Sequence, residues 1–529
     1  MEQRITLNKN IDREGRQILI FEKENTADIV LPDYCDDINR IIRVDARPIL
    51  KDKYAAKDSI RLSGMIAVSV IYISEPYNQL RSFSFTSDFD YNIERAGVNQ
   101  SDLIAADMAV SHLGCRLQNP RKLAVKIEIG VRLKVFPHSP RFSGIALGED
   151  SEDMSADSEI FESAAAGAEK LQHRRERMLV SSTLVGNGEV RIEENIVIPN
   201  DMPAVSEIIY ADVNIVIDDI KPLYAKAAVK FTANVKCLYS SLGEESDYIT
   251  ITKKIPSTHI IDIDDLDEGF ECFAKGILSG LKTDIDIDPY GENRIINLGF
   301  SVDFETLAMR NHETEIISDA FSTRFESTSE MKSFSADRFV SIRRERREHE
   351  DSSTLEDVIS GTVKDITGIV VIENAVVEGS RVNVQGSAEM SVMVRNREGE
   401  LQNFDCTIPV NFDLGIDESP AGGQAEVSGV ILEAAASIDG ERLSVRLSVM
   451  YECIVTDSRQ VQIMDSIIIH NENPKQRKDD VQMIIYYPNR NENLWDIAKR
   501  YNADIERLTK INKCENANAG DKKIIMVLP

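Results

Sequence analysis

The side chains that most often do chemistry in proteins are present here, but they are not arranged in reactive groups. The seven histidines and the seven cysteines are scattered singly, and no two cysteines have the C-x-x-C spacing. We therefore expect neither a zinc site nor a disulfide framework. Acidic pairs such as Asp264-Asp265 have the chemistry of a metal site or a glycosidase, but a chain with 89 acidic residues brings carboxylates together by chance.

The sequence also lacks the short motifs that mark common catalytic sites. It contains no P-loop, no G-x-S-x-G, no H-E-x-x-H and no G-x-G-x-x-G. Each of these motifs places a nucleophile, a metal or a phosphate at a defined turn, so their absence removes the usual signals of catalysis. We predict a protein that is not an enzyme and that uses no cofactor and no metal.

Two features have both a functional and a structural interpretation. Trp495, the only tryptophan, has a flat face on which a sugar ring stacks, and it is also a residue that packs partly into small cores. The sequence leaves these two roles open. The run "SIRRERREHE" (341–350) offers arginines for docking, but its glutamates and His349 favour a solvated charged segment.

Composition restricts the class of partner. The net charge of −28 over 529 residues argues against a nucleic-acid binder, which needs a basic face for phosphates. From Asp480 onward the chain has eight Lys/Arg and seven Asp/Glu, so the acidity lies before that point. No apolar run approaches the ~18–20 residues of a membrane helix, and the first residues do not resemble a signal peptide. We expect a cytosolic protein without a membrane span.

The elements that must position any site are repeated along the chain. "DIVLPDYCDDINRIIRVDA" (28–46) recurs as "NIVIPNDMPAVSEIIYADV" (195–213), and each matched pair, such as Pro32 and Pro199 or Asp45 and Asp212, is 167 residues apart. Runs rich in β-branched residues follow each copy and recur a third time at 382–396.

Each copy closes with a long predicted hairpin, at 108–136, 272–305 and 425–455, with turns at Asn119-Pro120, Pro289-Tyr290-Gly291 and Asp439-Gly440. Alternation of apolar and charged residues in the first hairpin predicts one dry and one wet face. The predicted fold class is mainly all-β, with three repeated antiparallel modules of the sandwich or barrel type.

The boundaries follow from composition. Residues 143–172 carry eight acidic residues and one lysine, which is typical of a linker. We place module 1 at 1–140, the acidic linker at 141–175, module 2 at 176–325, a divergent module 3 at 326–472 and a terminal domain at 480–529. A second, polar linker is expected at 471–480.

The terminal domain has a different pattern. Met483, Ile485 and Tyr487 alternate as a short strand. Asn493 and Asp504 are expected to cap two short amphipathic helices, and "KKIIMVLP" supplies a closing strand. The predicted order is β-α-α-β.

This segment resembles a LysM domain through "ENLWDIAKRY" (492–501), "LTKIN" (508–512) and "AGDKKIIMVLP" (519–529). The resemblance implies a shallow groove for N-acetylglucosamine chains, or a reuse of that groove against a protein, because Asn491, Asn493 and Ala519 stand where the family usually has Gly, Thr/Ser and Pro. The candidate binding residues are Asn491, Glu492, Asn493, Trp495, Asn512, Lys513 and Gly520.

Three β modules followed by LysM are similar to SipL-like spore-coat morphogenesis proteins, which are built from SPOCS-type β modules and a C-terminal LysM. The resemblance implies a scaffold of the mother-cell cytoplasm that is recruited to the forespore surface and joins the coat basement-layer ATPase of the stage IV sporulation protein A type. The alternative is a protein that binds the N-acetylglucosamine chains of peptidoglycan in spore cortex or cell wall.

Overall fold

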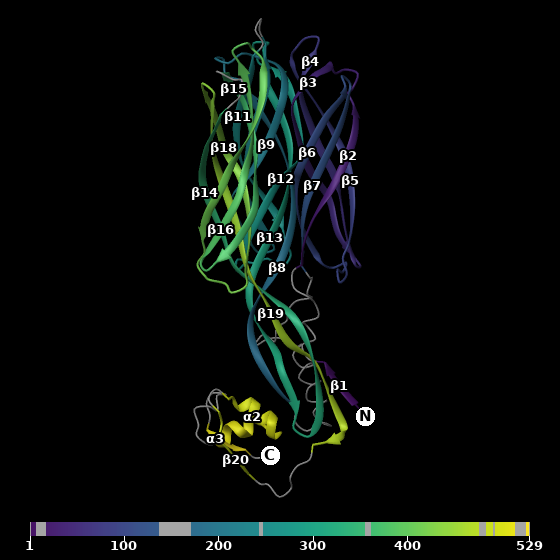
Figure 1. Ribbon diagram of the computed structural model, residues 1–529, viewed down its shortest axis with the longest axis vertical. Helices are drawn as coiled ribbons and strands as arrows, with labels where there is room; N and C mark the ends of the chain where they lie inside the picture. Colours follow the sequence, from purple (N-terminus) through teal and green to yellow (C-terminus); the bar gives the residue numbers. More distant parts are fainter. Residues whose placement is uncertain are drawn as a thin grey trace.

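The computed structural model describes residues 2–6, 17–136, 171–242, 247–354, 361–475, 483–489, 492–513 and 525–527. Over these ranges the chain is mainly antiparallel β-structure, which confirms the predicted fold class. A broad body of long strands narrows into a stalk, and a small helical module lies at the end of the stalk (Figure 1).

The first module is a sandwich of two three-stranded sheets. The sheets have the strand orders β2-β7-β6 and β3-β4-β5. The strands are β2 (Gln17–Val30), β3 (Asp37–Ala56), β4 (Ser59–Glu75), β5 (Leu80–Glu94), β6 (Leu103–Asn119) and β7 (Lys122–Phe136).

The second and third modules repeat this topology strand for strand. Their sheets are β8-β13-β12 with β9-β10-β11, and β14-β19-β18 with β15-β16-β17. The strands are β8 (Leu171–Val197), β9 (Val205–Leu223), β10 (Lys226–Ser241), β11 (Tyr248–Asp262), β12 (Glu271–Ile287), β13 (Asn293–Ser322), β14 (Phe325–Thr354), β15 (Gly361–Glu378), β16 (Arg381–Asn396), β17 (Leu401–Gly415), β18 (Gly423–Asp439) and β19 (Arg442–Pro474). In each module the first strand pairs with the last.

The three closing hairpins form where the sequence predicts them. β6 turns into β7 after Asn119, β12 into β13 around Tyr290, and β18 into β19 after Asp439. Along β7, Val125 and Ile127 are buried while Lys126 between them is exposed. One-face burial explains this alternation, because successive side chains in a strand point to opposite faces.

The charged run at 341–350 is solvated along one face, as expected, with Arg346, Glu348 and Glu350 exposed, but it is also an ordered strand. It forms the upper part of β14, the first strand of module 3, and it pairs with β19 throughout. Its charges find partners in the neighbouring strands, as Arg344 does with Glu452 at 2.6 Å. The ladder and these ion pairs offset the weak strand propensity of the run.

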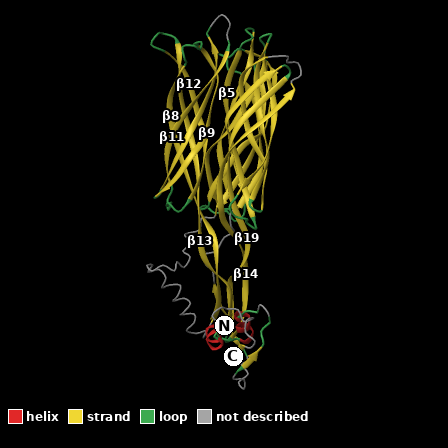
Figure 2. Cartoon of the chain, turned by 90° about the vertical axis from the view of Figure 1, so that its left-hand side faces the viewer, coloured by secondary structure: helices red, strands yellow, loops and turns green. Residues whose placement is uncertain are grey.

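Four strands continue beyond the body and form the stalk. The lower parts of β8 and β13 make one ribbon, and those of β14 and β19 make a second one (Figure 2). The ribbons pack through Val180, Ile316, Ala336 and Ile463. A short N-terminal strand, β1 (Glu2–Thr6), adds to β19 near the end of the stalk. Because of the stalk, β8 begins inside the segment expected to be the linker 141–175, and β19 runs into the second expected linker.

The C-terminal module has the predicted β-α-α-β order. It consists of β20 (Ile484–Tyr486), α2 (Leu494–Tyr501), α3 (Ile505–Asn512) and β21 (Ile525–Val527). The Asn493 side chain accepts from the Asp496 amide, and that of Asp504 accepts from the Glu506 and Arg507 amides. Both predicted caps are therefore confirmed. Most of the expected acidic linker lies outside the described residues.

Candidate functional site

Two of the predicted groove residues fix the fold of the C-terminal module. Glu492 accepts hydrogen bonds from the Asn489 amide at 3.0 Å and from the Tyr486 hydroxyl at 2.9 Å. The Asn489 amide is the largest influence that lowers the pKa of Glu492, with Tyr486 and Arg500 adding to it. Asn493 caps α2 through its bond to the Asp496 amide at 2.8 Å. Both side chains thus hold the turn that leads into α2.

Asn512 and Lys513 lie at the end of α3. Buried Asn512 donates to the carbonyl oxygen of Met526 at 2.8 Å and accepts from the Met526 amide at 2.7 Å, so it ties α3 to β21. Lys513 has a left-handed backbone at the helix C-terminus, and it is exposed. The other two predicted residues, Asn491 and Gly520, lie outside the described residues.

Trp495 faces the stalk. Its side chain is only 5% exposed. Its indole Nε1 donates to Asp319 of β13 at 2.8 Å, and its ring meets Phe321 edge to face with centroids 5.1 Å apart. Lys499 adds a salt bridge to the same Asp319 at 2.7 Å. Of the two roles that the sequence left open, packing describes this position, and the packing partner belongs to another element.

Further polar contacts attach the module to the end of the stalk. Lys475 donates to the Ser322 carbonyl at 2.9 Å and to the Asn502 side chain at 2.7 Å. The Ile505 amide at the start of α3 donates to Gln172 at 3.2 Å. The C-terminal module therefore rests on a platform at the ends of β8, β13 and β19.

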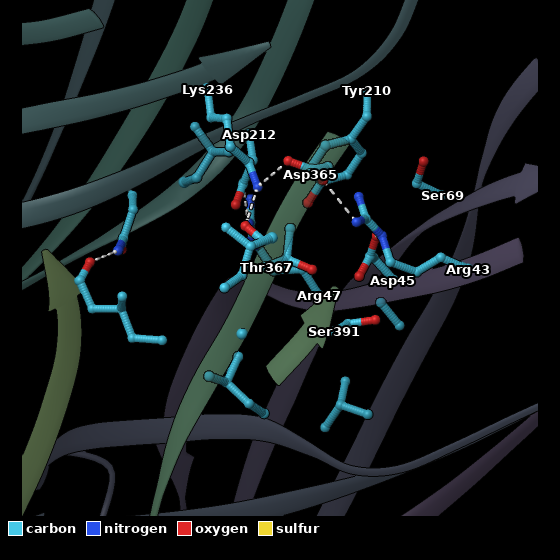
Figure 3. A pocket seen from close by; sticks show the side chains of 18 of the residues that line it. Arg43, Asp45, Arg47, Ser69, Tyr210, Asp212, Lys236, Asp365, Thr367 and Ser391 are labelled. Carbon is cyan, nitrogen blue, oxygen red and sulfur yellow. Dashed lines mark hydrogen bonds and ion pairs between the residues drawn. The ribbon is translucent and has the colours of Figure 1, made fainter. Parts of the chain in front are cut away.

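Sequence reasoning missed a second site, at the centre of the body. The three modules surround a cavity of about 2350 Å³ whose lining comes from all three. Arg43 and Asp365 lie against this cavity and are almost completely buried. Figure 3 shows Asp365 between Lys236 and Arg43, with Tyr210 beside the guanidinium.

The central contacts join the modules through charge. Asp365 of module 3 accepts from Arg43 of module 1 at 2.8 Å and pairs with Lys236 of module 2 at 2.9 Å. Arg43 also stacks over the ring of Tyr210, 4.7 Å from its centroid. Burial by itself raises the pKa of Asp365, but Lys236 and Arg43 outweigh it and lower that pKa. Burial raises the pKa of the Tyr210 phenol well above its ordinary value.

Three of these residues occupy one repeated position. Arg43 pairs with Ile71, Tyr210 with Leu238 and Asp365 with Met393, each directly beside a register shift. The partners Ile71, Leu238 and Met393 belong to one buried cluster between the modules. A sequence signal existed, because Arg43 and Tyr210 stand two residues before the aligned pair Asp45 and Asp212. The third copy could not be aligned there from sequence.

The charged groups at this centre hold the three modules together. Its cations and carboxylates pair with one another, as Arg43 also does with Asp45 at 2.9 Å. In the described ranges no group of three or more His, Cys, Asp or Glu is placed to hold a metal ion, and each of the six cysteines there is free. Neither helix of the described part is long and apolar enough to cross a membrane.

The fold and its two sites define a class: a protein of three β-sandwich modules joined at one centre, with a small helical module on a stalk. Residues 37–118 and 204–286 match the family model of the SipL SPOCS domain. These segments contain β3 to β6 of module 1 and the equivalent β9 to β12 of module 2. No curated protein matches the chain. The match supports the SipL-like resemblance of the β modules and points to a sporulation-related protein.

Proposed function

We propose that this protein is a non-enzymatic scaffold of bacterial spore coat assembly. It links the coat basement-layer ATPase, of the stage IV sporulation protein A type, to the forespore surface from the mother-cell side. The observation that carries the proposal is the SPOCS match, which falls on the same strands of two modules. The third module repeats that topology in residues outside the matched segments.

The shape of the molecule suits a linking role. β13 extends beyond the body from about Arg310 to Ser322, which corresponds to roughly 40 Å of strand. The C-terminal module at the end of this stalk is nearly neutral, whereas residues 1–479 carry 53 Lys/Arg and 82 Asp/Glu. An acidic partner is repelled by the body and not by the module. In this proposal the LysM-like module contacts the ATPase and the β modules contact the forespore side.

The test is a titration of the full chain with the purified ATPase and, separately, with N-acetylglucosamine oligomers. We expect binding of the ATPase, weakened roughly tenfold by Lys513→Glu, because exposed Lys513 lies at the predicted groove. Lys510→Glu, the same charge change at an exposed residue of α3 three positions earlier, is the control. Tight oligosaccharide binding without ATPase binding would replace this proposal with the peptidoglycan-binding alternative.

A further inference from the structure

The outer face of the β20–β21 ribbon consists of apolar side chains. Met483, Ile485, Tyr487 and Met526 are 50%, 55%, 69% and 39% exposed, respectively. Ile485 and Met526 are directly opposed in the ladder. The alternate residues of both strands point inward and join the core of the module, with Ile525 and Val527 completely buried. The ribbon is therefore apolar on both faces.

The exposure of apolar side chains on the outer face of so small a module requires an explanation. A ribbon that covers two helices with one face normally turns polar side chains to water on the other. The strand is predicted from the alternating apolar residues Met483, Ile485 and Tyr487. In the structure these residues form the exposed face of the strand and not its buried face. Adjacent apolar side chains at the surface are typical of a docking face. Among the described residues, the contacts from the module to the stalk come from Trp495, Lys499, Asn502 and Ile505, and none comes from this face.

Charge indicates which partner covers the face. The described ribbon residues 483–487 and 525–527 include no charged side chain, so the face is complementary to itself. Two copies that meet there bring together their nearly neutral ends. Their acidic bodies stay a stalk length of roughly 40 Å away, several times the ~8 Å Debye length of physiological salt. A contact between two bodies would instead oppose like charges.

We propose that a second copy of this chain covers the outer face of the β20–β21 ribbon. The two ribbons pack face to face about a two-fold axis, so that Ile485 and Met526 of one copy contact the same residues of the other. Such an isologous contact uses one patch on both subunits and closes at a dimer. This inference does not depend on binding of the ATPase.

Sedimentation of the full chain tests the proposal. We expect a reversible dimer, which Ile485→Glu or Met526→Glu weakens at least tenfold because a carboxylate becomes buried in the contact. Ile260→Glu is the matched control, since Ile260 lies on a strand of module 2 with 54% exposure against 55% for Ile485. The emission of Trp495, the only tryptophan, verifies in each variant that the C-terminal module is folded.

Salt gives an independent readout. Because the contact is apolar and the acidic bodies stay several Debye lengths apart, higher ionic strength should not weaken the dimer, whereas it would weaken a contact made of ion pairs. A wild-type chain that stays monomeric at its highest soluble concentration overturns the proposal and assigns the face to another protein. A dimer that survives both glutamate variants with normal Trp495 emission also overturns it.

Discussion

Arg43, Tyr210 and Asp365 occupy equivalent positions in the three modules and meet in one contact. Identical residues there would place three like charges or three phenols together, whereas a cation, an aromatic ring and an anion attract one another. Asp365 has no exposed side-chain surface and accepts from cations of both other modules. The repeat has therefore diverged where its copies touch, and this divergence specifies which module lies beside which.

Asp365→Ala is expected to destabilise the body strongly. It leaves the buried Arg43 guanidinium with Asp45 alone and removes the carboxylate partner of Lys236, and breaking a buried pair in this way typically costs about 3–5 kcal/mol. Urea unfolding followed by far-UV circular dichroism measures the effect. Asp90→Ala removes a carboxylate from an ion pair of the same type, with Arg61, but on the surface, and should leave the midpoint almost unchanged. Equal effects of the two variants would show that the buried joint has no special role.

Acid should weaken a second contact between modules. Asp107 of module 1 pairs with Lys275 of module 2 at 2.6 Å. Burial raises the pKa of Asp107, but Lys275 and Lys134 outweigh it and lower this pKa to about 2. The contribution of ionised Asp107 to the free energy of unfolding is therefore complete above the ordinary carboxyl pKa of 3.8. It is lost as the pH falls towards about 2.

The comparison of wild type with Asp107→Asn in urea unfolding tests this dependence. The variant should be less stable near pH 5, and the difference should shrink as the pH approaches 2, where wild-type Asp107 is itself becoming neutral. A difference that stays constant over this range would contradict the assigned pKa shift.

At the scale of elements, the attachment of α2 to the stalk depends on one carboxylate. Asp319→Ala removes the acceptor of both Trp495 and Lys499. We expect acrylamide to quench Trp495 more strongly, and the transition seen by its fluorescence to lose about 1–3 kcal/mol, because a buried indole N–H is left unsatisfied. Glu313→Ala, an exposed carboxylate on the same strand, is the control. Unchanged quenching in Asp319→Ala would show that Phe321 and the neighbouring contacts suffice.

The elements themselves could be predicted where burial or capping is local. One-face burial sets a period of two in β7, and Asn493 and Asp504 lie next to the helices they cap. The contacts between elements could not be predicted. Arg43 and Asp365 are 322 positions apart, and Trp495 and Asp319 are 176 apart, so no local pattern records either pair. The outward face of β20 was missed because alternation identifies two faces without indicating which is buried.

At the scale of the whole molecule, the body and the C-terminal module have separate cores. The module's core is its own except for Phe321 of the stalk. The body adds a buried cluster shared by all three modules to the core of each. A module this small buries little apolar surface. We therefore expect Trp495 fluorescence to report unfolding at lower urea than far-UV circular dichroism, which the strands of the body dominate. Coincident transitions would show that the molecule unfolds as one unit.

The stalk strands have a mechanical consequence. β13, β14 and β19 each run without a break from inside the body to the end of the stalk, where β13 turns into β14 at Thr323-Arg324. Their ladder hydrogen bonds lie across the strands. A pull along the long axis therefore loads many of these bonds together in shear, instead of opening them one after another. A molecule held at both ends in this direction transmits tension through the continuous β-ladder of the stalk. We therefore expect the contacts that hold the two ends to break before the stalk unfolds.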